Sequence, residues 1–429
     1  MTDIFNNLYS IIKNIKNNIA FYPTVLALIG FAFSLLMIVL EEYGISEFLI
    51  DSTPALVVED GNTALSILSV CITGLISMMV FSFSMVMLVL SQASSNFSPR
   101  LLPGLVSDKR NQIILGLYLS TIVYNIFTVV SIESAGKDYL SHGFSVLLGI
   151  IGTIVCLGAF IYFIHNMSQS IQISIILDTI YEEAKNRLEK LIELANMENI
   201  NSNNALDSSS WHCYTYYKSG YFQNYNTQAI IKFCKSQETR IHIVKAKGLF
   251  VLRNEPFILS EKKLTDKQLK DCYSNIYFSK NELVRDNYNL AFKQITEIIV
   301  KAMSPGINDP GTAVNGIDYL TELLALRLQK KDLESIIDKE SSTHYGKVTV
   351  ITFSELLSNL MASLRTYCKH DPVVVQKLVG MLTYLEGQEH VENEYKITIK
   401  EELSILIHHA KSAFETKKDK ALIQNVLKA

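Results

Sequence analysis

Hydroxyl side chains recur at a fixed interval in one long uncharged stretch of the sequence. Serines stand seven residues apart, and a threonine and one more serine fall on the same side: Thr73, Ser77, Ser84, Ser91, Ser95 and Ser98. A straight helix drifts by only about 20° per seven residues, so these hydroxyls share one helix face. Hydroxyl oxygens at membrane depth can replace the water around a permeating ion. The spacing therefore predicts a pore lining, with Phe97 as an apolar constriction and Arg100 at the cytosolic exit.

The same residues have a second interpretation that involves no transport. Serine and threonine let membrane helices approach closely, and they bond to backbone carbonyls or to neighbouring helices. On this interpretation the hydroxyl face is buried between helices of a packed bundle. The sequence leaves both interpretations open.

The hydroxyl face belongs to one of four apolar segments. Each segment is free of charge over about 20 residues or more, which is the length a helix needs to cross the hydrocarbon core. The four lie near residues 21–40, 63–90, 111–132 and 144–164. The sequence thus predicts a mainly α membrane protein, with four transmembrane helices followed by a mixed cytosolic region that holds a small β-rich module and helical hairpins.

Charge in the flanks of the segments predicts their orientation, because Lys and Arg stay on the cytoplasmic side. Lys13 and Lys16 precede the first segment, whereas the connection 41–62 holds six acidic residues and no basic one. That connection is predicted to lie outside, where its carboxylates would concentrate cations at an outer mouth. Both chain termini are then cytosolic.

The remaining pattern predicts the organisation along the chain. An interfacial helix is expected over 1–20 and the four-helix transmembrane domain over 21–165. After the last span the helical period continues into a cytosolic stalk, predicted over 166–195. A linker rich in Asn and Ser follows over 196–210. Aromatic and β-branched residues between turn signals predict a small β-rich module over 211–260, and helices are expected over 261–429.

A short loop between two predicted helices is rich in turn residues. It contains Ser304, Pro305, Gly306, Asn308, Asp309 and Pro310. Asp309 before Pro310 is typical of a helix N-cap followed by the first helical position. The loop is predicted to be a structural turn, and a subunit or metal contact through Asn308 and Asp309 is the alternative. Two oxygen ligands alone do not make a calcium or magnesium site.

Other classes of function find no support in the sequence. The histidines form no metal motif, and neither a phosphate-binding glycine loop nor a nucleophile elbow is present. We therefore expect no enzyme activity, no catalytic residue, no cofactor and no bound metal. The net charge of -3 and the absence of a basic stripe argue against nucleic acid as a partner. The apolar segments hold no Asp, Glu, Lys, Arg or His, which disfavours proton-coupled transport.

Two strings of the sequence resemble a known family. They are Ser91-Gln92-Ala93-Ser94-Ser95-Asn96-Phe97-Ser98-Pro99-Arg100 and Ser304-Pro305-Gly306-Ile307-Asn308-Asp309-Pro310-Gly311-Thr312-Ala313. Together with Ser219-Gly220-Tyr221-Phe222-Gln223, they make the chain similar to an uncharacterised bacterial family of predicted membrane proteins with a domain of unknown function. The resemblance covers almost the whole chain and implies a multi-pass protein of the bacterial inner (plasma) membrane. It implies no activity.

The sequence favours a homo-oligomeric ion channel or small-solute pore lined by the second span, with the cytosolic region assembling it. Its expected partners are the lipid bilayer, further copies of the chain and inorganic ions. The alternative is a membrane-anchored scaffold or sensor that acts through its cytosolic region and transports nothing.

Overall fold

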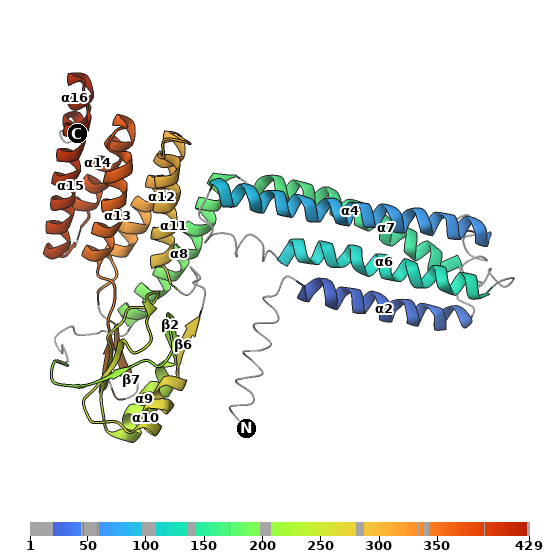
Figure 1. The fold of residues 1–429 in the computed structure, drawn as a ribbon, viewed down its shortest axis with the longest axis horizontal. Helices are drawn as coiled ribbons and strands as arrows, with labels where there is room; N and C mark the ends of the chain where they lie inside the picture. The colour runs from blue at the N-terminus through green and yellow to red at the C-terminus, as the bar shows by residue number, and fades with distance from the viewer. Residues whose placement is uncertain are drawn as a thin grey trace. The chain divides into compact units, whose positions relative to one another are not determined.

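The computed structural model describes most of the chain. The described residues are 20–43, 46, 58, 60–96, 109–135, 143–170, 172–197, 207–279, 287–332, 334–338, 341, 343–389 and 391–426. The chain divides into two compact units, which we call the membrane unit (residues 1–172) and the C-terminal unit (residues 173–429) (Figure 1).

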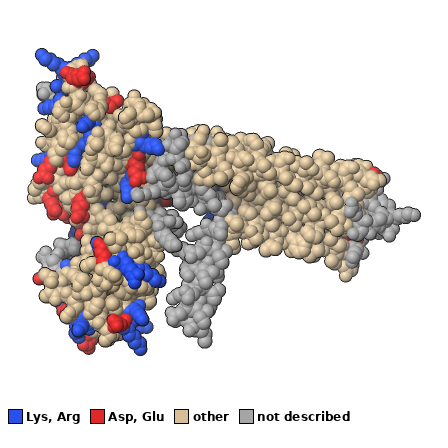
Figure 2. Space-filling view, viewed as in Figure 1, with Lys and Arg blue, Asp and Glu red and all other residues tan. Residues whose placement is uncertain are grey.

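The membrane unit contains four long apolar helices. They are α2 (Phe21–Glu42), α4 (Gly61–Asn96), α6 (Lys109–Ala135) and α7 (Gly143–Ser170). Each is long and apolar enough to cross a bilayer, and together they confirm the prediction of four candidate spans. Figure 2 shows that the surface over these helices is almost free of Lys, Arg, Asp and Glu, whereas such residues are frequent over the C-terminal unit. That contrast is typical of a surface in contact with lipid.

Glycines set the closest helix contact of the membrane unit. Helix α2 packs along α6, and a Cβ placed at Gly30 would lie 2.5 Å from the carbonyl oxygen of Ser120. Gly116 of α6 likewise lies against Leu26, because a Cβ there would be 2.6 Å from its methyl group. Since the lipid tails are as apolar as the side chains, close packing of this kind is what holds membrane helices together.

The C-terminal unit consists of helices and two small sheets. Its helices are α8 (Ile173–Met197), α9 (Thr227–Gln237), α10 (Asp266–Ser274), α11 (Asn289–Ala302), α12 (Pro310–Leu328), α13 (Phe353–Cys368), α14 (Pro372–Glu386), α15 (Asn393–Ala413) and α16 (Lys417–Val426). Its strands are β1 (His212–Thr215), β2 (Gly220–Tyr225), β3 (Ile241–Ile243), β4 (Phe250–Val251), β5 (Pro256–Ser260), β6 (Ile276–Ser279), β7 (Glu334–Asp338) and β8 (Thr343–Val348). One sheet has the order β1-β5-β3-β8-β7, in which only β3 and β8 run parallel, and the other is an antiparallel sheet of order β4-β2-β6.

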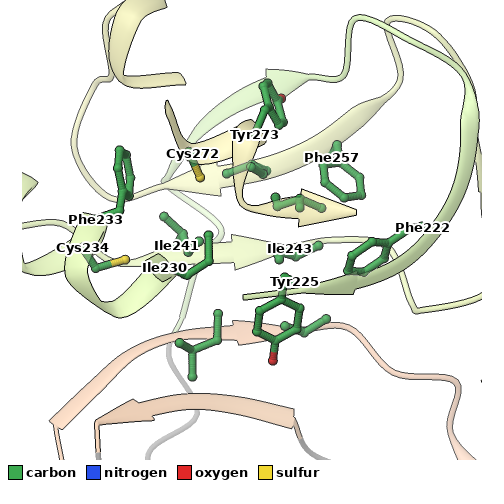
Figure 3. Packing of buried hydrophobic residues seen from close by; sticks show 14 of the residues in the cluster. Phe222, Tyr225, Ile230, Phe233, Cys234, Ile241, Ile243, Phe257, Cys272 and Tyr273 are labelled. Carbon is green, nitrogen blue, oxygen red and sulfur yellow. The ribbon is translucent and has the colours of Figure 1, made fainter. Parts of the chain in front are cut away.

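An aromatic and aliphatic core joins the two sheets to α9 and α10. Phe222 of β2 and Phe257 of β5 are fully buried, and their rings meet edge to face with centroids 5.2 Å apart. Ile241 and Ile243 alternate with half-buried His242 along β3, so one face of the strand points into this core (Figure 3). Alternation of this kind is expected of a strand with one buried face, and β3 is held in place by its pairing with β5 and β8.

The helical part begins with two helices in close contact. Gly316 of α12 lies against Ile299 of α11, where a Cβ would come within 2.6 Å of the isoleucine side chain. Helices α13 and α10 both begin with a capping box, built on Thr352 and Thr265. Asp371 caps α14 before Pro372. These local signals fix where the helices start.

The structure differs from the sequence prediction at two boundaries. The sequence predicts that the β-rich module ends at residue 260, but both sheets continue beyond it in the sequence. Strand β6 belongs to one sheet, and β7 and β8 belong to the other. The predicted helical domain over 261–429 therefore also contains strands. Helix α7 ends at Ser170 and α8 begins at Ile173, so the stalk is not an unbroken continuation of the fourth span. The predicted interfacial helix over 1–20, apart from its last residue, and most of the linker over 196–210 lie outside the described residues.

Candidate functional site on the second span

The hydroxyl face of α4 points away from the helices that α4 packs against. The contact face of α4 follows a repeat of seven, with Leu68, Leu75 and Val89 buried against α6 and α7. Ser77 lies two residues after Leu75, and at about 100° per residue this places it about 200° around the helix. The hydroxyl face is thus opposite the packed face. Four of its members are exposed in the single chain, namely Thr73, Ser77, Ser84 and Ser91.

The exposed hydroxyls bond to their own helix. Thr73 Oγ1 donates to the carbonyl of Ser69 at 2.8 Å, and Ser77 Oγ donates to the carbonyl of Thr73 at 2.9 Å. Ser84 Oγ donates to the carbonyl of Val80 at 2.9 Å. Each proton is engaged with the backbone four residues earlier, so the outward-facing oxygen lone pairs present acceptors. A row of hydroxyl acceptors can coordinate a cation or accept hydrogen bonds from water.

Apolar side chains separate the hydroxyls along the same face. Val70, Phe81 and Leu88 are 72%, 49% and 53% exposed and lie within about 40° of Ser77 on the helix wheel. Gly74 has no neighbour within 4 Å of where its Cβ would be. The face is therefore mixed, because hydroxyl and apolar side chains alternate along it.

Part of the predicted lining falls beyond the described part of α4. The side chain of Ser95 and the residues Phe97, Ser98 and Arg100 lie outside the described residues. Helix α4 is described as far as Asn96 and is 36 residues long, which corresponds to about 54 Å at 1.5 Å per residue. The predicted constriction and exit remain predictions.

A second set of polar side chains lies inside the membrane unit and was missed by the sequence analysis. Tyr118, Thr121, Asn125 and Thr128 follow each other on one side of α6 and are all buried. Thr121 and Thr128 donate to backbone carbonyls four residues earlier. Neither amide atom of Asn125 has a hydrogen-bond partner among the described residues. The alternating spacing of three and four residues within span three was the signal that could have revealed this row.

Glu41, one of the six acidic residues of the predicted outer mouth, does not face the solvent. Its side chain is 2% exposed, and its carboxylate accepts hydrogen bonds from the backbone N–H and the hydroxyl of Ser145 at 2.8 and 2.6 Å. Ser46 donates to the other carboxylate oxygen at 2.5 Å, and its own hydroxyl accepts from the N–H of Phe144. A carboxylate that caps the start of α7 in this way is not available to attract cations. The contact spans 104 residues, so no local pattern announces it.

The loop at 304–311 forms a capped turn. Asp309 accepts hydrogen bonds from the N–H and the hydroxyl of Thr312 at 3.1 and 2.6 Å, and Pro310 occupies the first turn of α12. The hydrogen bonds from Thr312 lower the pKa of Asp309. Asn308 has a φ of 50°, which asparagine tolerates better than most residues. The geometry of the loop is therefore that of a helix start. Among the described residues, no group of three or more His, Cys, Asp or Glu could hold a metal ion.

His242 is the histidine with the most defined polar surroundings in the described part of the chain. Its Nδ1 lies 2.8 Å from Ser208 Oγ, and its Nε2 lies 2.9 Å from Thr349 Oγ1. Burial, and to a smaller extent the charge of Lys347, lowers the pKa of His242 to about 4. Through these two hydrogen bonds His242 ties strand β3 to two other segments of the chain.

These observations define a multi-pass membrane protein with a C-terminal unit of helices and two small sheets. Residues 16–384 match the family described as "Predicted membrane protein (DUF2254)", and the chain belongs to that family. It is 21% identical over 362 residues to "Uncharacterized protein MT1328" of Mycobacterium tuberculosis (strain CDC 1551 / Oshkosh), a match that covers 80% of this chain and 67% of that protein. It is 20% identical, with the same coverage, to "Uncharacterized protein Mb1321c" of Mycobacterium bovis (strain ATCC BAA-935 / AF2122/97). No solved structure matches the chain.

Proposed function

We propose that this protein is a homo-oligomeric channel or pore in which copies of α4 surround the conduction path. The observation that carries the proposal is the outward direction of Thr73, Ser77, Ser84 and Ser91, opposite the face of α4 that packs within its own bundle. A ring of such helices would place hydroxyl oxygens around a central axis. Those oxygens would substitute for part of the water around an ion.

The apolar steps on the same face suit a gated path. Phe81 and Leu88 alternate with Ser77, Ser84 and Ser91, so a ring of α4 helices would present apolar rings between hydroxyl rings. Apolar rings in a narrow pore exclude water and thereby stop ions. A small rotation of α4 would exchange the residues that face the axis. We assign the gating movement to the C-terminal unit. We further propose that the chain lies in the bacterial inner membrane and that both of its termini are on the cytosolic side.

Ion flux through proteoliposomes tests the proposal. The purified chain should release trapped ions at a measurable rate, and Ser84→Leu should reduce that rate about tenfold, which corresponds to a barrier raised by about 1.4 kcal/mol. The matched control is Phe83→Leu, because Phe83 is 58% exposed but lies about 100° away from Ser84. Size-exclusion chromatography of both variants should give the wild-type elution volume. Absence of flux, or equal flux in Ser84→Leu and Phe83→Leu, would sink the channel.

A second candidate function is an anchored scaffold or sensor, and a groove on the C-terminal unit favours it. The groove has a volume of about 420 Å³ and lies between α12 and α14, with Val314 and Thr321 on one side and Val373 and Gly380 on the other. An ion pair between Lys377 and Asp318 joins the two helices there. This candidate predicts that the C-terminal unit fused to another membrane anchor retains the function in cells, whereas a channel would lose it.

A further inference from the structure

Two turns of the C-terminal unit form one edge of the three-stranded sheet. The first turn connects β1 to β2, and the second surrounds β4. They are bonded to each other, because the N–H of Arg253 donates to Ser219 Oγ at 3.0 Å and the N–H of Asn254 donates to the carbonyl of Tyr216 at 2.8 Å. We call this surface the basic-aromatic edge and define it by Tyr217, Lys218, Leu249, Phe250, Leu252 and Arg253.

Large apolar side chains of this edge are exposed together. Leu252 and Tyr217 are 59% and 53% exposed, and Phe250 and Leu249 are 47% and 42% exposed. Phe250 leans on the ring of Tyr221 across the strand pair, with centroids 5.0 Å apart. These four side chains lie outside the four candidate spans, so the apolar surface expected of a span does not account for their exposure. A group of apolar side chains exposed together outside a membrane span is typical of a contact site.

Positive charge surrounds the apolar side chains. Lys218 and Arg253 are exposed, and the Lys218 ammonium lies 5.3 Å from the centre of the Tyr217 ring. Lys247 is half-buried, with its ammonium 4.6 Å from the centre of the Tyr225 ring. The nearby carboxylate of Glu255 is paired with Lys245 and also accepts from the N–H of Leu252. The edge is therefore cationic around an apolar centre.

We propose that the basic-aromatic edge binds the headgroup region of the bilayer in which the chain is anchored, through anionic phospholipids. Leucine and aromatic side chains of exposed turns insert at the boundary between headgroups and acyl chains, while Lys and Arg contact phosphates. The four spans already hold the chain at the membrane, so the effective concentration of lipid near the edge is high. Even a weak contact between the edge and lipid is then formed much of the time. The proposal rests on the membrane location of the chain and not on ion conduction.

A second copy of the chain fits this surface less well than lipid does. In a two-fold contact the same patch meets itself, so Lys218 and Arg253 of one copy would approach the same residues of the other. Like charges brought together in this way oppose association. A phosphate surface has the complementary charge and no fixed shape to match. The bilayer is therefore the occupant that both the charges and the exposed apolar side chains favour.

The experiment measures how fast a cysteine at the edge reacts with a charged, membrane-impermeant maleimide. Leu252→Cys is introduced into the full-length chain carrying Cys213→Ser, because Cys213 is an exposed native cysteine. The protein is placed in nanodiscs of phosphatidylcholine alone, in nanodiscs that also contain phosphatidylglycerol, and in detergent. Lys263→Cys in the same background provides an exposed control site outside the edge, and the background without an added cysteine gives the baseline.

The expected result is that the thiol introduced by Leu252→Cys reacts about tenfold more slowly in anionic nanodiscs than in phosphatidylcholine, with no change at the control site. Adding Lys218→Glu and Arg253→Glu should restore the faster rate, since both side chains are exposed and their reversal repels the phosphates. Equal rates in the two kinds of nanodisc would overturn the proposal. Protection that persists in detergent would also overturn it, because the edge would then be covered by protein.

Discussion

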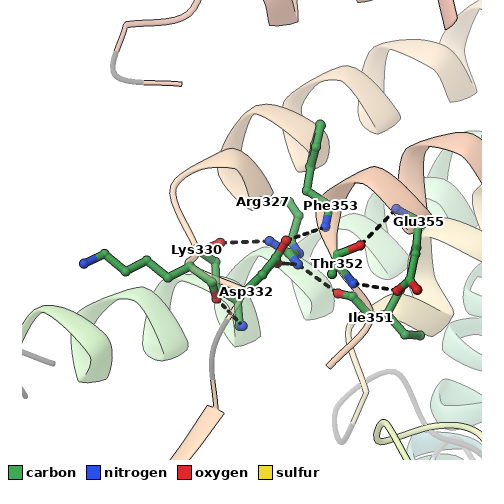
Figure 4. Close-up of polar contacts among 8 residues, drawn as sticks. Arg327, Lys330, Asp332, Ile351, Thr352, Phe353 and Glu355 are labelled. Carbon is green, nitrogen blue, oxygen red and sulfur yellow. Dashed lines mark hydrogen bonds and ion pairs between the residues drawn. The ribbon is translucent and has the colours of Figure 1, made fainter. Parts of the chain in front are cut away.

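Arg327 carries a positive charge although none of its side chain is exposed to water. Its guanidinium donates to the carbonyls of Lys330 and Ile351 at 2.8 and 3.0 Å and pairs with Asp332, which in turn accepts from the N–H of Phe353 (Figure 4). The network ties the end of α12 to the start of α13. A buried charge of this kind is tolerated because its partners replace the lost water.

Breaking this network should destabilise the C-terminal unit. We expect Arg327→Met to lower the free energy of unfolding by about 3 kcal/mol, because Asp332 would lose its cationic partner in a mostly buried place. Urea denaturation followed by the fluorescence of Trp211, the only tryptophan of the chain, measures the change. Lys262→Ala, which removes an exposed ion pair with Glu238, should change it by less than about 1 kcal/mol. Equal effects of the two substitutions would contradict the role given to Arg327.

His242 should make the stability of the C-terminal unit depend on pH. Its pKa is lowered by burial to about 4, whereas the unfolded chain has the ordinary value near 6.5. Between these values the unfolded state binds more protons, so stability falls as the pH drops from about 6.5 towards 4. The urea midpoint reported by Trp211 should be lower at about pH 5 than at about pH 7. This difference between the two pH values should shrink in His242→Gln. It should persist in the control His370→Gln, which replaces an exposed histidine. The reverse pattern would refute the assignment of the pH dependence to His242.

At the scale of elements, two glycines in helices have opposite surroundings. A Cβ at Gly316 would lie 2.6 Å from Ile299, whereas a Cβ at Gly380 would meet nothing within 4 Å. We expect Gly316→Ala to destabilise the unit by about 1–3 kcal/mol, since α11 and α12 would be forced apart. Gly380→Ala should stabilise it by up to about 1 kcal/mol through helix propensity. The same urea denaturation provides the comparison, and destabilisation by both variants would contradict the close contact inferred at Gly316.

Elements with a local signature could be predicted from the sequence. The four spans follow from uncharged length, and the start of α12 follows from Asp309 beside Pro310. Strand β8 could not be predicted, because it pairs in parallel with β3 from about 100 residues away, with Ile241 opposite Gly346. A Cβ at Gly346 would lie 2.2 Å from the carbonyl oxygen of Ile241, so the glycine marks that close approach. Nothing adjacent in sequence indicates the pairing.

The candidate site was predictable to a similar degree. The shared face of Ser77, Ser84 and Ser91 follows from their spacing of seven residues. Which side of α4 packs against α6 and α7 depends on contacts with residues such as Tyr118, and these are set by tertiary packing. The burial of Glu41 depends in the same way on Ser145, which is distant in sequence. Spacing therefore predicts which residues act together, and packing decides where they point.

At the scale of the whole molecule, the proposal requires several copies of the chain around one axis. The four hydroxyls lie on the side of α4 that the other helices of the membrane unit leave exposed. The four-helix membrane unit satisfies its own packing on the opposite side of α4, so oligomerisation is expected to use the hydroxyl face. A variant that fills this face, Ser77→Leu together with Ser84→Leu, should abolish ion flux. Wild-type flux from this double variant would exclude the face as the path.

The most direct test of the central claim is a cryo-EM reconstruction of the full-length protein in nanodiscs, read for subunit number and for what α4 faces. We predict a ring of subunits with Thr73, Ser77, Ser84 and Ser91 directed at the central axis. A monomer, or an oligomer in which these hydroxyls face lipid or are buried between packed helices, would contradict the claim and favour the anchored scaffold.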